Sequence, residues 1–370
     1  MDGYTSLNNT TSGLCFSTRF PPIVRLNNTI TSHLFSTIFS GLGLTSNFFA
    51  FCVLVGAYRR TQSRSRSSFL IFLCGLVVTD FAGLLVTGSI VLTYHYNRFI
   101  WEEVDPNCHL CNFMGLSMVF FGLCPLLLGA TMAIERFMGI NRPFSRSSNM
   151  SKRRALCTVL LVLAFACFIG ILPIMGLGHY KLQYPKSWCF FSITPEPVDQ
   201  VFSLIFSLVG LLSIVVSILL NTVSVVTLFK VCCDRESVQR RRDHEVEMMV
   251  QLLGIMVIAS VCWCPLLIFV AQTAASNEST VSNKTMQVNL LIYIRLVTWN
   301  QILDPWVYIL FRRAVLRRVY PDLGRTRASI MSMYPMMTTS LRRKLTRVEI
   351  SNILIYKPYV KNRSCSVLVW

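Results

Sequence analysis

The chain has 370 residues, of which 53% are hydrophobic and only 14% are charged. Soluble domains carry about 25% charged residues, so this composition excludes an ordinary soluble domain and indicates a membrane protein. A formal net charge of +18 would suggest a nucleic-acid partner for a soluble protein. No basic segment alternates with aromatic residues that could stack on bases, so we expect no nucleic-acid binding.

Seven apolar runs of nearly bilayer-spanning length recur along the chain. We predict spans at about Leu34–Ala57, Phe69–Tyr94, Leu110–Ile134, Ala155–Gly176, Val201–Phe229, Met248–Ala274 and Leu290–Phe311. The expected fold is therefore all-α, a seven-transmembrane-helix bundle over residues 34–311. Residues 1–33 are polar and rich in Asn, Thr and Ser, so we expect no cleavable signal sequence there.

Basic residues indicate how the bundle is oriented. Alternate connections hold 27 of the 35 Lys and Arg residues, at 58–67, 141–154, 230–244 and from 312 onward. By the positive-inside rule the amino terminus is expected outside and the carboxyl terminus in the cytosol, in a multi-pass plasma-membrane protein. We predict a short amphipathic inner-leaflet helix at 312–320, followed by a basic, Ser/Thr-rich, disordered cytoplasmic tail over 321–370.

Glycosylation motifs agree with this orientation. Asn8, Asn9 and Asn27 each begin an Asn-X-Ser/Thr sequence in the segment expected outside. We therefore predict glycosylation of the amino-terminal segment.

Four of the fourteen cysteines map to the outer side: Cys15, Cys108, Cys111 and Cys189. An even number of cysteines in an oxidising compartment predicts two disulfides, with three possible pairings. A bridge from the start of the third helix to Cys189 would hold the apolar loop 177–198 across the bundle mouth as a lid.

Arg295 lies in the middle of the last apolar run. A charge at this depth costs about 2.5–3.5 kcal/mol, so it is usually retained for function and faces a cavity or the bundle interior. Asp304 follows nine residues later, and at about 100° per residue it lies on the opposite side of the helix. The partner of Arg295 is therefore expected from outside its helix, either an interhelical polar group or the anion of a ligand.

Further polar residues lie within three of the spans: Asn47, Asp80, Asn300, Asp304 and Tyr308. Buried acids in a bilayer need partners or water, so we expect a shared polar core that can rearrange. Pro265 and Pro305 remove backbone hydrogen bonds and kink their helices. Bent helices around a polar core are typical of a conformational switch.

The third span ends at Glu135-Arg136, where the cytosolic face begins. The two side chains can form a local ion pair, and release of Arg136 would present a forked hydrogen-bond donor to a cytosolic partner.

Taken together, these motifs resemble the rhodopsin-like G-protein-coupled receptors over nearly all of residues 33–320. The motifs are Asn47, Asp80, Glu135-Arg136-Phe137, Cys262-Trp263-Cys264-Pro265 and Asp304-Pro305-Trp306-Val307-Tyr308, one to a span and in order. The resemblance implies a seven-helix receptor that activates a heterotrimeric G protein.

Three features look like the prostanoid receptors within that class: Arg295, Asp304 where most relatives carry Asn, and the string Ser187-Trp188-Cys189-Phe190. Met118 stands where amine receptors carry an aspartate, which disfavours an amine ligand. Strings such as Thr298–Asp304 look like the thromboxane branch. Departures from the family are Phe137, Lys186 in place of Gly and Ser192 in place of Thr.

The resemblance implies a role for each site residue. Arg295 would bind the carboxylate of a thromboxane or endoperoxide ligand, with further contacts from Thr87, Met118, Ser187, Trp188, Ser192 and Trp299. The switch would comprise Asn47, Asp80, Trp263, Pro265, Asn300, Asp304 and Tyr308. Glu135 and Arg136 would couple to a G protein of the Gq class, which signals through phospholipase C and calcium. The implied disulfides are Cys111–Cys189 and Cys15–Cys108, and the tail would bind arrestin and receptor kinases.

Three alternatives compete with this prediction. One is a receptor for another prostaglandin. A transporter of lipid carboxylates would need inverted repeats, which seven non-repeating spans do not offer. An enzyme or metal protein would need clustered ligands, but the five histidines are scattered at 33, 95, 109, 179 and 244. We therefore expect no catalytic residues, no cofactor and no metal.

Overall fold

The computed structural model describes residues 14–16, 33–61, 64–141, 150–234, 239–276 and 283–310. The predicted glycosylation sites Asn8, Asn9 and Asn27 lie outside the described residues, as do the predicted amphipathic helix at 312–320 and the tail. The described residues therefore comprise the helical bundle and the loops at one of its ends.

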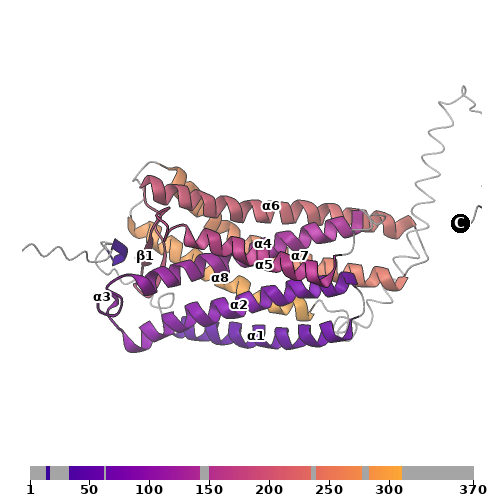
Figure 1. The fold of residues 1–370 in the computed structure, drawn as a ribbon, viewed down its shortest axis with the longest axis horizontal. Helices are drawn as coiled ribbons and strands as arrows, with labels where there is room; N and C mark the ends of the chain where they lie inside the picture. The colour runs from indigo at the N-terminus through magenta and orange to yellow at the C-terminus, as the bar shows by residue number, and fades with distance from the viewer. Residues whose placement is uncertain are drawn as a thin grey trace, which may run out of the picture. The chain divides into compact units, whose positions relative to one another are not determined.

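Seven long helices form the bundle, as the apolar runs predicted (Figure 1). They are α1 His33–Arg60, α2 Arg64–Asn97, α4 His109–Asn141, α5 Lys152–Ile171, α6 Pro197–Asp234, α7 Gln239–Ala275 and α8 Asn283–Leu310. Each predicted span overlaps one of these helices, but the fourth, Ala155–Gly176, was drawn too long, since α5 ends at Ile171 and turns follow.

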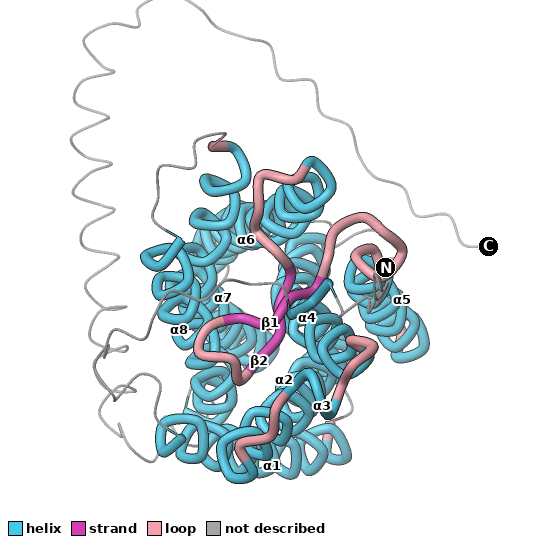
Figure 2. Tube along the Cα trace, turned by 90° about the vertical axis from the view of Figure 1, so that its left-hand side faces the viewer, coloured by secondary structure: helices cyan, strands magenta, loops and turns pink. Residues whose placement is uncertain are grey.

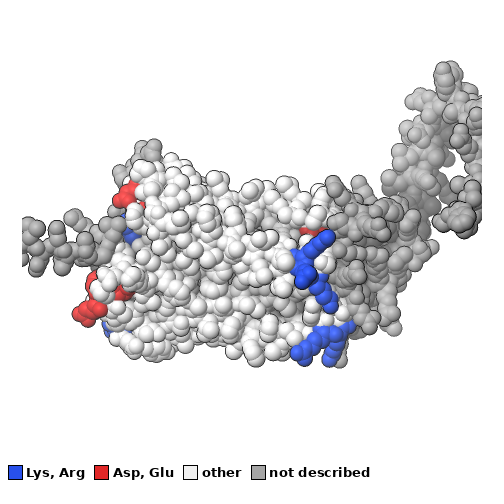
Figure 3. Space-filling model, in the orientation of Figure 1, with Lys and Arg blue, Asp and Glu red and all other residues white. Residues whose placement is uncertain are grey.

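Six of the long helices in the described residues are long and apolar enough to cross a bilayer. Helix α8 is long enough, but its membrane-length stretch is less apolar than those of the other six. The reason is its polar content, since Arg295, Asn300 and Asp304 all lie within it. It nevertheless runs alongside the other six and packs against α1, α2 and α7 (Figure 1). On the face in Figure 3 an uncharged band separates Lys and Arg, mainly at one end, from Asp and Glu, mainly at the other.

Helix α6 shows how the bundle packs with small polar residues facing inward. Its lipid side exposes large apolar residues such as Leu208, Leu212 and Leu219, whereas small polar residues face inward. The buried ones are Ser203, Ser207, Ser213, Ser217, Asn221 and Ser224. Small residues let neighbouring helices approach closely and can hydrogen-bond to the helix backbone, so this stripe lets α6 pack against α4 and α7.

The loop expected as a lid contains two strands, which the all-α prediction did not include. Strands β1 Tyr180–Gln183 and β2 Trp188–Phe191 pair antiparallel, with Tyr180 opposite Phe191. The hairpin crosses the mouth of the bundle, beside α4 and the four-residue helix α3 Trp101–Val104 (Figure 2). We call this the hairpin end. All four residues of β2 are buried, and such an aromatic-rich segment is typical of a strand.

Covalent bonds and hydrogen bonds hold the hairpin in place. Disulfides join Cys111 to Cys189 and Cys15 to Cys108, the pairings that the family resemblance implied. The Tyr180 hydroxyl donates to the carbonyl of Gly170 at 2.6 Å, and burial raises the pKa of this phenol. The hairpin is therefore fixed to α4 on one side and to the end of α5 on the other.

Candidate functional site

Arg295 lies on α8 with its guanidinium directed at α1. Its Nη2 donates to Ser36 Oγ at 3.2 Å, and its Cζ lies 4.4 Å from the centre of the Phe35 ring. The Nε atom is buried without a hydrogen-bond partner, and no carboxylate of the described residues lies within ion-pair distance. Arg295 therefore meets a neutral hydroxyl and an aromatic face from another helix, and has capacity left for an anion.

Trp299 follows one turn after Arg295 and also packs against α1. Its ring meets Phe39 edge to face at 4.7 Å, and Phe39 stacks on Phe35 at 3.8 Å. Trp299 is 41% exposed. The structure therefore places it at the surface of the α1–α8 pair rather than inside the bundle.

The hairpin carries three of the predicted ligand residues: Ser187, Trp188 and Ser192. Ser187 is fully buried and its Oγ has no hydrogen-bond partner among the described residues. Trp188 is buried and its Nε1 donates to the carbonyl of Tyr184 at 2.8 Å, whereas Ser192 Oγ donates to Thr194 Oγ1 at 3.4 Å. Of these three residues, only Ser187 has an unused polar side-chain atom.

The remaining predicted ligand residues lie on α2 and α4. Thr87 Oγ1 donates to the carbonyl of Gly83 in its own helix at 2.6 Å. Met118 is half-buried and packs against the apolar cluster beneath the hairpin. The seven predicted residues thus come from four elements, with Arg295 and Trp299 beside α1 and the hairpin residues beside α4 and α6.

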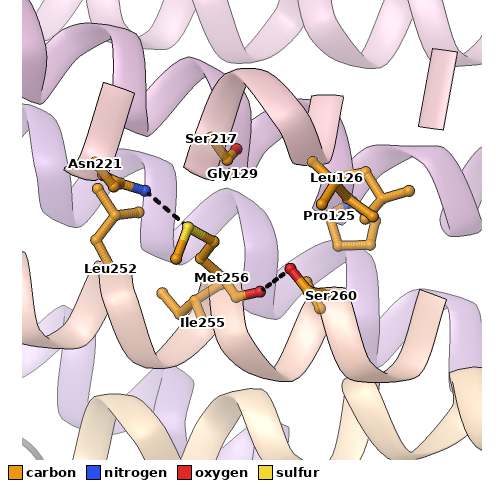
Figure 4. Close-up of a pocket in the computed structure, with 11 residues that line it drawn as sticks. Pro125, Leu126, Gly129, Ser217, Asn221, Leu252, Ile255, Met256 and Ser260 are labelled. Carbon is orange, nitrogen blue, oxygen red and sulfur yellow. Dashed lines mark hydrogen bonds between the residues drawn. The ribbon is translucent and has the colours of Figure 1, made fainter. Parts of the chain in front are cut away.

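A small cavity between α4, α6 and α7 is too small to be a ligand site (Figure 4). Its volume is about 20 Å³, which is room for about one water molecule. Asn221 Nδ2 contacts Met256 Sδ at 3.6 Å, and Ser260 Oγ donates to the carbonyl of Met256 at 2.7 Å. The cavity therefore marks loose packing where α7 faces α6, and none of the predicted ligand residues lines it.

Polar residues inside the bundle form the expected core between α1, α2 and α8. Asn47 Nδ2 donates to the carbonyl of Gln301 at 2.8 Å, and Asn300 Nδ2 donates to Asp304 Oδ2 at 2.9 Å. Asp80 is fully buried, and neither carboxyl oxygen has a partner among the described residues; the same holds for the Tyr308 hydroxyl. Polar side chains of α1, α2 and α8 thus meet in one buried region, where Asp80 and Tyr308 keep unused hydrogen-bonding capacity.

Trp263 and Pro265 lie on α7 at the predicted bend. Trp263 is buried, and its ring lies so close to Gly122 of α4 that an added Cβ there would approach Cη2 to 2.8 Å. Rotation of the Trp263 side chain therefore changes the packing between α4 and α7.

At the end opposite the hairpin, Arg136 is held by several neighbours. Its Nε donates to Glu135 Oε2 at 2.6 Å, and Ser68 Oγ donates to Glu135 Oε1 at 2.7 Å. Arg136 Nη1 lies 3.4 Å from Met248 Sδ, and its Cζ lies 5.4 Å from the Phe69 ring centre. Residues of α2 and α7 thus keep the Glu135–Arg136 pair buried, and an outward movement of α7 would remove one of its neighbours.

The sequence did not identify the residues that make these contacts with the predicted ones: Phe35, Ser36, Ser68, Phe69 and Gln301. Ser36, Ser40 and Asn47 are buried at helical spacing on α1. That polar face is visible in the sequence, and it could have identified α1 as the partner of α8.

Comparison with known proteins gives the family. Residues 47–308 match the model described as 7 transmembrane receptor (rhodopsin family). The chain is 57% identical to the thromboxane A2 receptor of Homo sapiens and 56% identical to that of Bos taurus, each over 84% of this chain and 91% of the relative. It is 39% identical to the prostaglandin F2-alpha receptor of Mus musculus, over 86% of this chain and 87% of that receptor.

A solved structure, that of squid rhodopsin, has the same fold. The TM-score is 0.65 at 17% identity, over 81% of this chain and 88% of rhodopsin. Together with the seven-helix bundle, these matches identify a membrane receptor with a lipid ligand and a G-protein partner, not an enzyme. The chain belongs to the rhodopsin family of seven-transmembrane receptors and, within it, to the prostanoid receptors.

Proposed function

We propose that the chain is a plasma-membrane receptor for thromboxane A2 or a prostaglandin endoperoxide and activates a G protein of the Gq class. Identity of 55–57% to thromboxane A2 receptors, against 39–40% to prostaglandin F2-alpha receptors, favours this ligand over another prostaglandin. The amino terminus and the hairpin end face the outside, and the basic connections face the cytosol.

The unused hydrogen-bonding capacity of Arg295 is the observation that carries the proposal. Its guanidinium has one hydroxyl partner, Ser36, and one ring, Phe35, and its Nε is unused. A carboxylate can accept two parallel hydrogen bonds from such a fork. The attraction is stronger in this poorly solvated setting than in water, so an acidic lipid gains more from the site than a neutral one.

The other ligand contacts extend from this anchor toward the hairpin. Ser187 Oγ, which is buried without a partner, supplies a hydrogen bond to an oxygen of the ligand. The hydroxyls of Thr87 and Ser192 already donate within the protein but can each accept a hydrogen bond. Trp188 supplies apolar surface at the hairpin, Trp299 supplies it beside Arg295 at the α1–α8 pair, and Met118 supplies an adaptable contact.

Ligand binding activates the receptor only if it favours the active arrangement over the inactive one. In the proposed sequence of events the polar core of Asp80, Asn300 and Asp304 rearranges and Trp263 rotates against α4. Helix α7 then swings outward, and Arg136 loses its Met248 neighbour and meets the G protein. The tail provides sites for receptor kinases and arrestin.

The test is a comparison of acidic and esterified ligands on the wild type and on Arg295→Gln. Arg295→Gln removes the guanidinium that pairs with the ligand carboxylate, so it is expected to weaken binding of the acid by about 2–5 kcal/mol. Competition binding on membranes measures this loss. The methyl ester should bind the wild type weakly and lose little further affinity in the variant.

Ser36→Ala is the matched control, because it removes the neutral neighbour of Arg295 but keeps the charge. It should change affinity far less than Arg295→Gln does, and surface expression of both variants should resemble the wild type. Equal losses for acid and ester on Arg295→Gln would mean that the arginine is structural.

A panel of labelled prostanoids separates the ligand assignments. Thromboxane and endoperoxide analogues are expected to compete best and to stimulate GTP exchange on a purified Gq-class protein. Tighter binding of prostaglandin F2-alpha would overturn the ligand assignment while leaving the receptor class intact.

A further inference from the structure

Three side chains able to bind a metal meet at the hairpin end. His179 directly precedes β1, Glu196 directly precedes α6, and Asp199 lies in the first turn of α6. His179 lies 17 residues before Glu196 and 20 before Asp199 in the sequence, and no metal site was expected. The hairpin reverses the chain between them and brings the imidazole beside the two carboxylates.

The separations of the donor atoms suit a divalent ion. His179 Nδ1 lies 3.1 Å from Asp199 Oδ1 and 3.8 Å from Glu196 Oε2, and all three donor atoms lie within 4.8 Å of one another. Two donors at about 2.1 Å from a tetrahedral zinc ion are about 3.4 Å apart. Small side-chain movements would therefore complete three zinc bonds.

Neighbouring groups hold the buried ligand in a suitable orientation. Asp199 is fully buried, and its second oxygen, Oδ2, accepts a hydrogen bond from Thr194 Oγ1 at 2.6 Å. The Oδ1 atom thus faces His179, and second-shell hydrogen bonds of this kind fix metal ligands. Glu196 is 57% exposed, so it can adjust its position and leave a fourth coordination position open to solvent.

Lys181 opposes a cation at this place but does not prevent binding. Its Nζ lies 4.0 Å from Asp199 Oδ2, on the oxygen that does not face His179. The two carboxylates outnumber the one ammonium around the imidazole, and this excess of negative charge favours a divalent ion. The positive charge of Lys181 is expected to weaken the affinity for the ion. Removing that charge should therefore strengthen ion binding, whereas removing a ligand should weaken it.

We propose that His179, Glu196 and Asp199 form a binding site for Zn²⁺ at the hairpin end. One imidazole nitrogen with two carboxylates suits zinc better than Ca²⁺ or Mg²⁺, which prefer more oxygen ligands. A bound ion fastens the base of the hairpin to the start of α6, in addition to the disulfide on α4. This site goes beyond the proposed lipid-receptor function and does not depend on it.

The experiment measures zinc binding to the purified full-length receptor, with any polyhistidine tag removed and no lipid ligand added. Calorimetric titration should show one saturable Zn²⁺ site, and zinc should raise the melting temperature because it binds the folded state. Excess Ca²⁺ or Mg²⁺ should not displace it.

Variants identify the ligands. His179→Gln and Glu196→Gln should each weaken zinc binding by more than about tenfold, and Thr194→Val by about tenfold through Asp199. Lys181→Gln should tighten it. His109→Gln is the matched control, because His109 is an exposed histidine at the start of α4 and lies outside the cluster.

Three outcomes would overturn the proposal: no saturable binding by the wild type, unchanged affinity in His179→Gln, or weaker affinity in Lys181→Gln. Glu196→Gln keeps the test valid if His179→Gln fails to fold, since Glu196 is exposed and its replacement has the same shape. Zinc binding is read without lipid, so its failure leaves the acid-versus-ester test of Arg295 untouched.

Discussion

The hairpin end and the polar core in the middle of the bundle differ in how their polar groups are satisfied. At the hairpin end, Trp101 Nε1 donates to the carbonyl of Lys186 at 2.7 Å, and Trp188 and Tyr180 also have acceptors. In the core, both carboxyl oxygens of Asp80 and the hydroxyl of Tyr308 are buried with no partner among the described residues.

This difference assigns a physical task to each region. At the hairpin end a buried strand, two disulfides and the satisfied donors of Trp101, Trp188 and Tyr180 favour one arrangement, with Ser187 Oγ the exception among these hairpin groups. In the core, the unused hydrogen-bonding capacity of Asp80 and Tyr308 offers groups that a second arrangement could pair. We infer that the hairpin shapes the ligand site while the core changes state.

Breaking the disulfide between Cys111 and Cys189 is expected to have the largest effect on ligand binding, because it loosens the region that we infer to be fixed. Cys111→Ser should abolish ligand binding at the cell surface, since losing a native disulfide costs about 2–5 kcal/mol and the hairpin loses its covalent link to α4. Saturation binding on intact cells measures this. Cys52→Ser, at an exposed free cysteine, is the control, and a free Cys111 thiol in functional receptor would contradict the expectation.

Crowding the packing between α4 and the hairpin should have the next largest effect. A Cβ added at Gly115 would lie 2.6 Å from Cγ of Tyr180, and overpacking of this kind costs about 1–3 kcal/mol. Gly115→Ala should lower the melting temperature and weaken ligand binding. Gly129→Ala on the same helix meets no atom within 4 Å and should be neutral or stabilising; equal destabilisation would refute the close fit.

Replacing an acid in each region should change stability in opposite directions. Asp80→Asn removes an ionisable group whose oxygens are buried without partners, so it should raise the free energy of unfolding by about 1 kcal/mol and reduce agonist-stimulated GTP exchange. Asp105 Oδ2 accepts from the backbone N–H of Cys111 at 2.9 Å, in the first turn of α4. Asp105→Ala should therefore lower stability by about 1 kcal/mol.

Thermal unfolding of the two purified variants in the same detergent gives the comparison directly. A loss of stability in both would mean that Asp80 is as well satisfied as Asp105, and the distinction between the regions would fail.

Relieving backbone strain in the hairpin turn should have the smallest effect. Lys186 has a φ of 74°, in the left-handed region that favours glycine. Lys186→Gly should raise stability by up to about 1 kcal/mol and keep the carbonyl that accepts from Trp101. Lys181→Gly, within strand β1, should lower it instead. A drop in melting temperature for Lys186→Gly would show that its side chain outweighs the strain.

The sequence alone determined the seven spans, because an uninterrupted apolar run long enough to cross a bilayer is rarely found outside transmembrane helices. It also determined the family, since Asp80, Glu135-Arg136 and Asp304–Tyr308 occur one to a span and in order. The seventh span, Leu290–Phe311, was predicted as an apolar run, and it falls on α8 although polar residues keep the overall hydropathy of that helix low.

Only the tertiary structure decided which groups from different segments meet. The contact of Arg295 with Ser36 joins residues distant in the chain, and the hairpin brings Tyr180 opposite Phe191 and His179 beside Asp199. Periodicity describes which face of a helix is apolar or polar, but it does not specify the neighbour that this face meets. That choice depends on how seven helices pack at once, so it became visible only in the folded bundle.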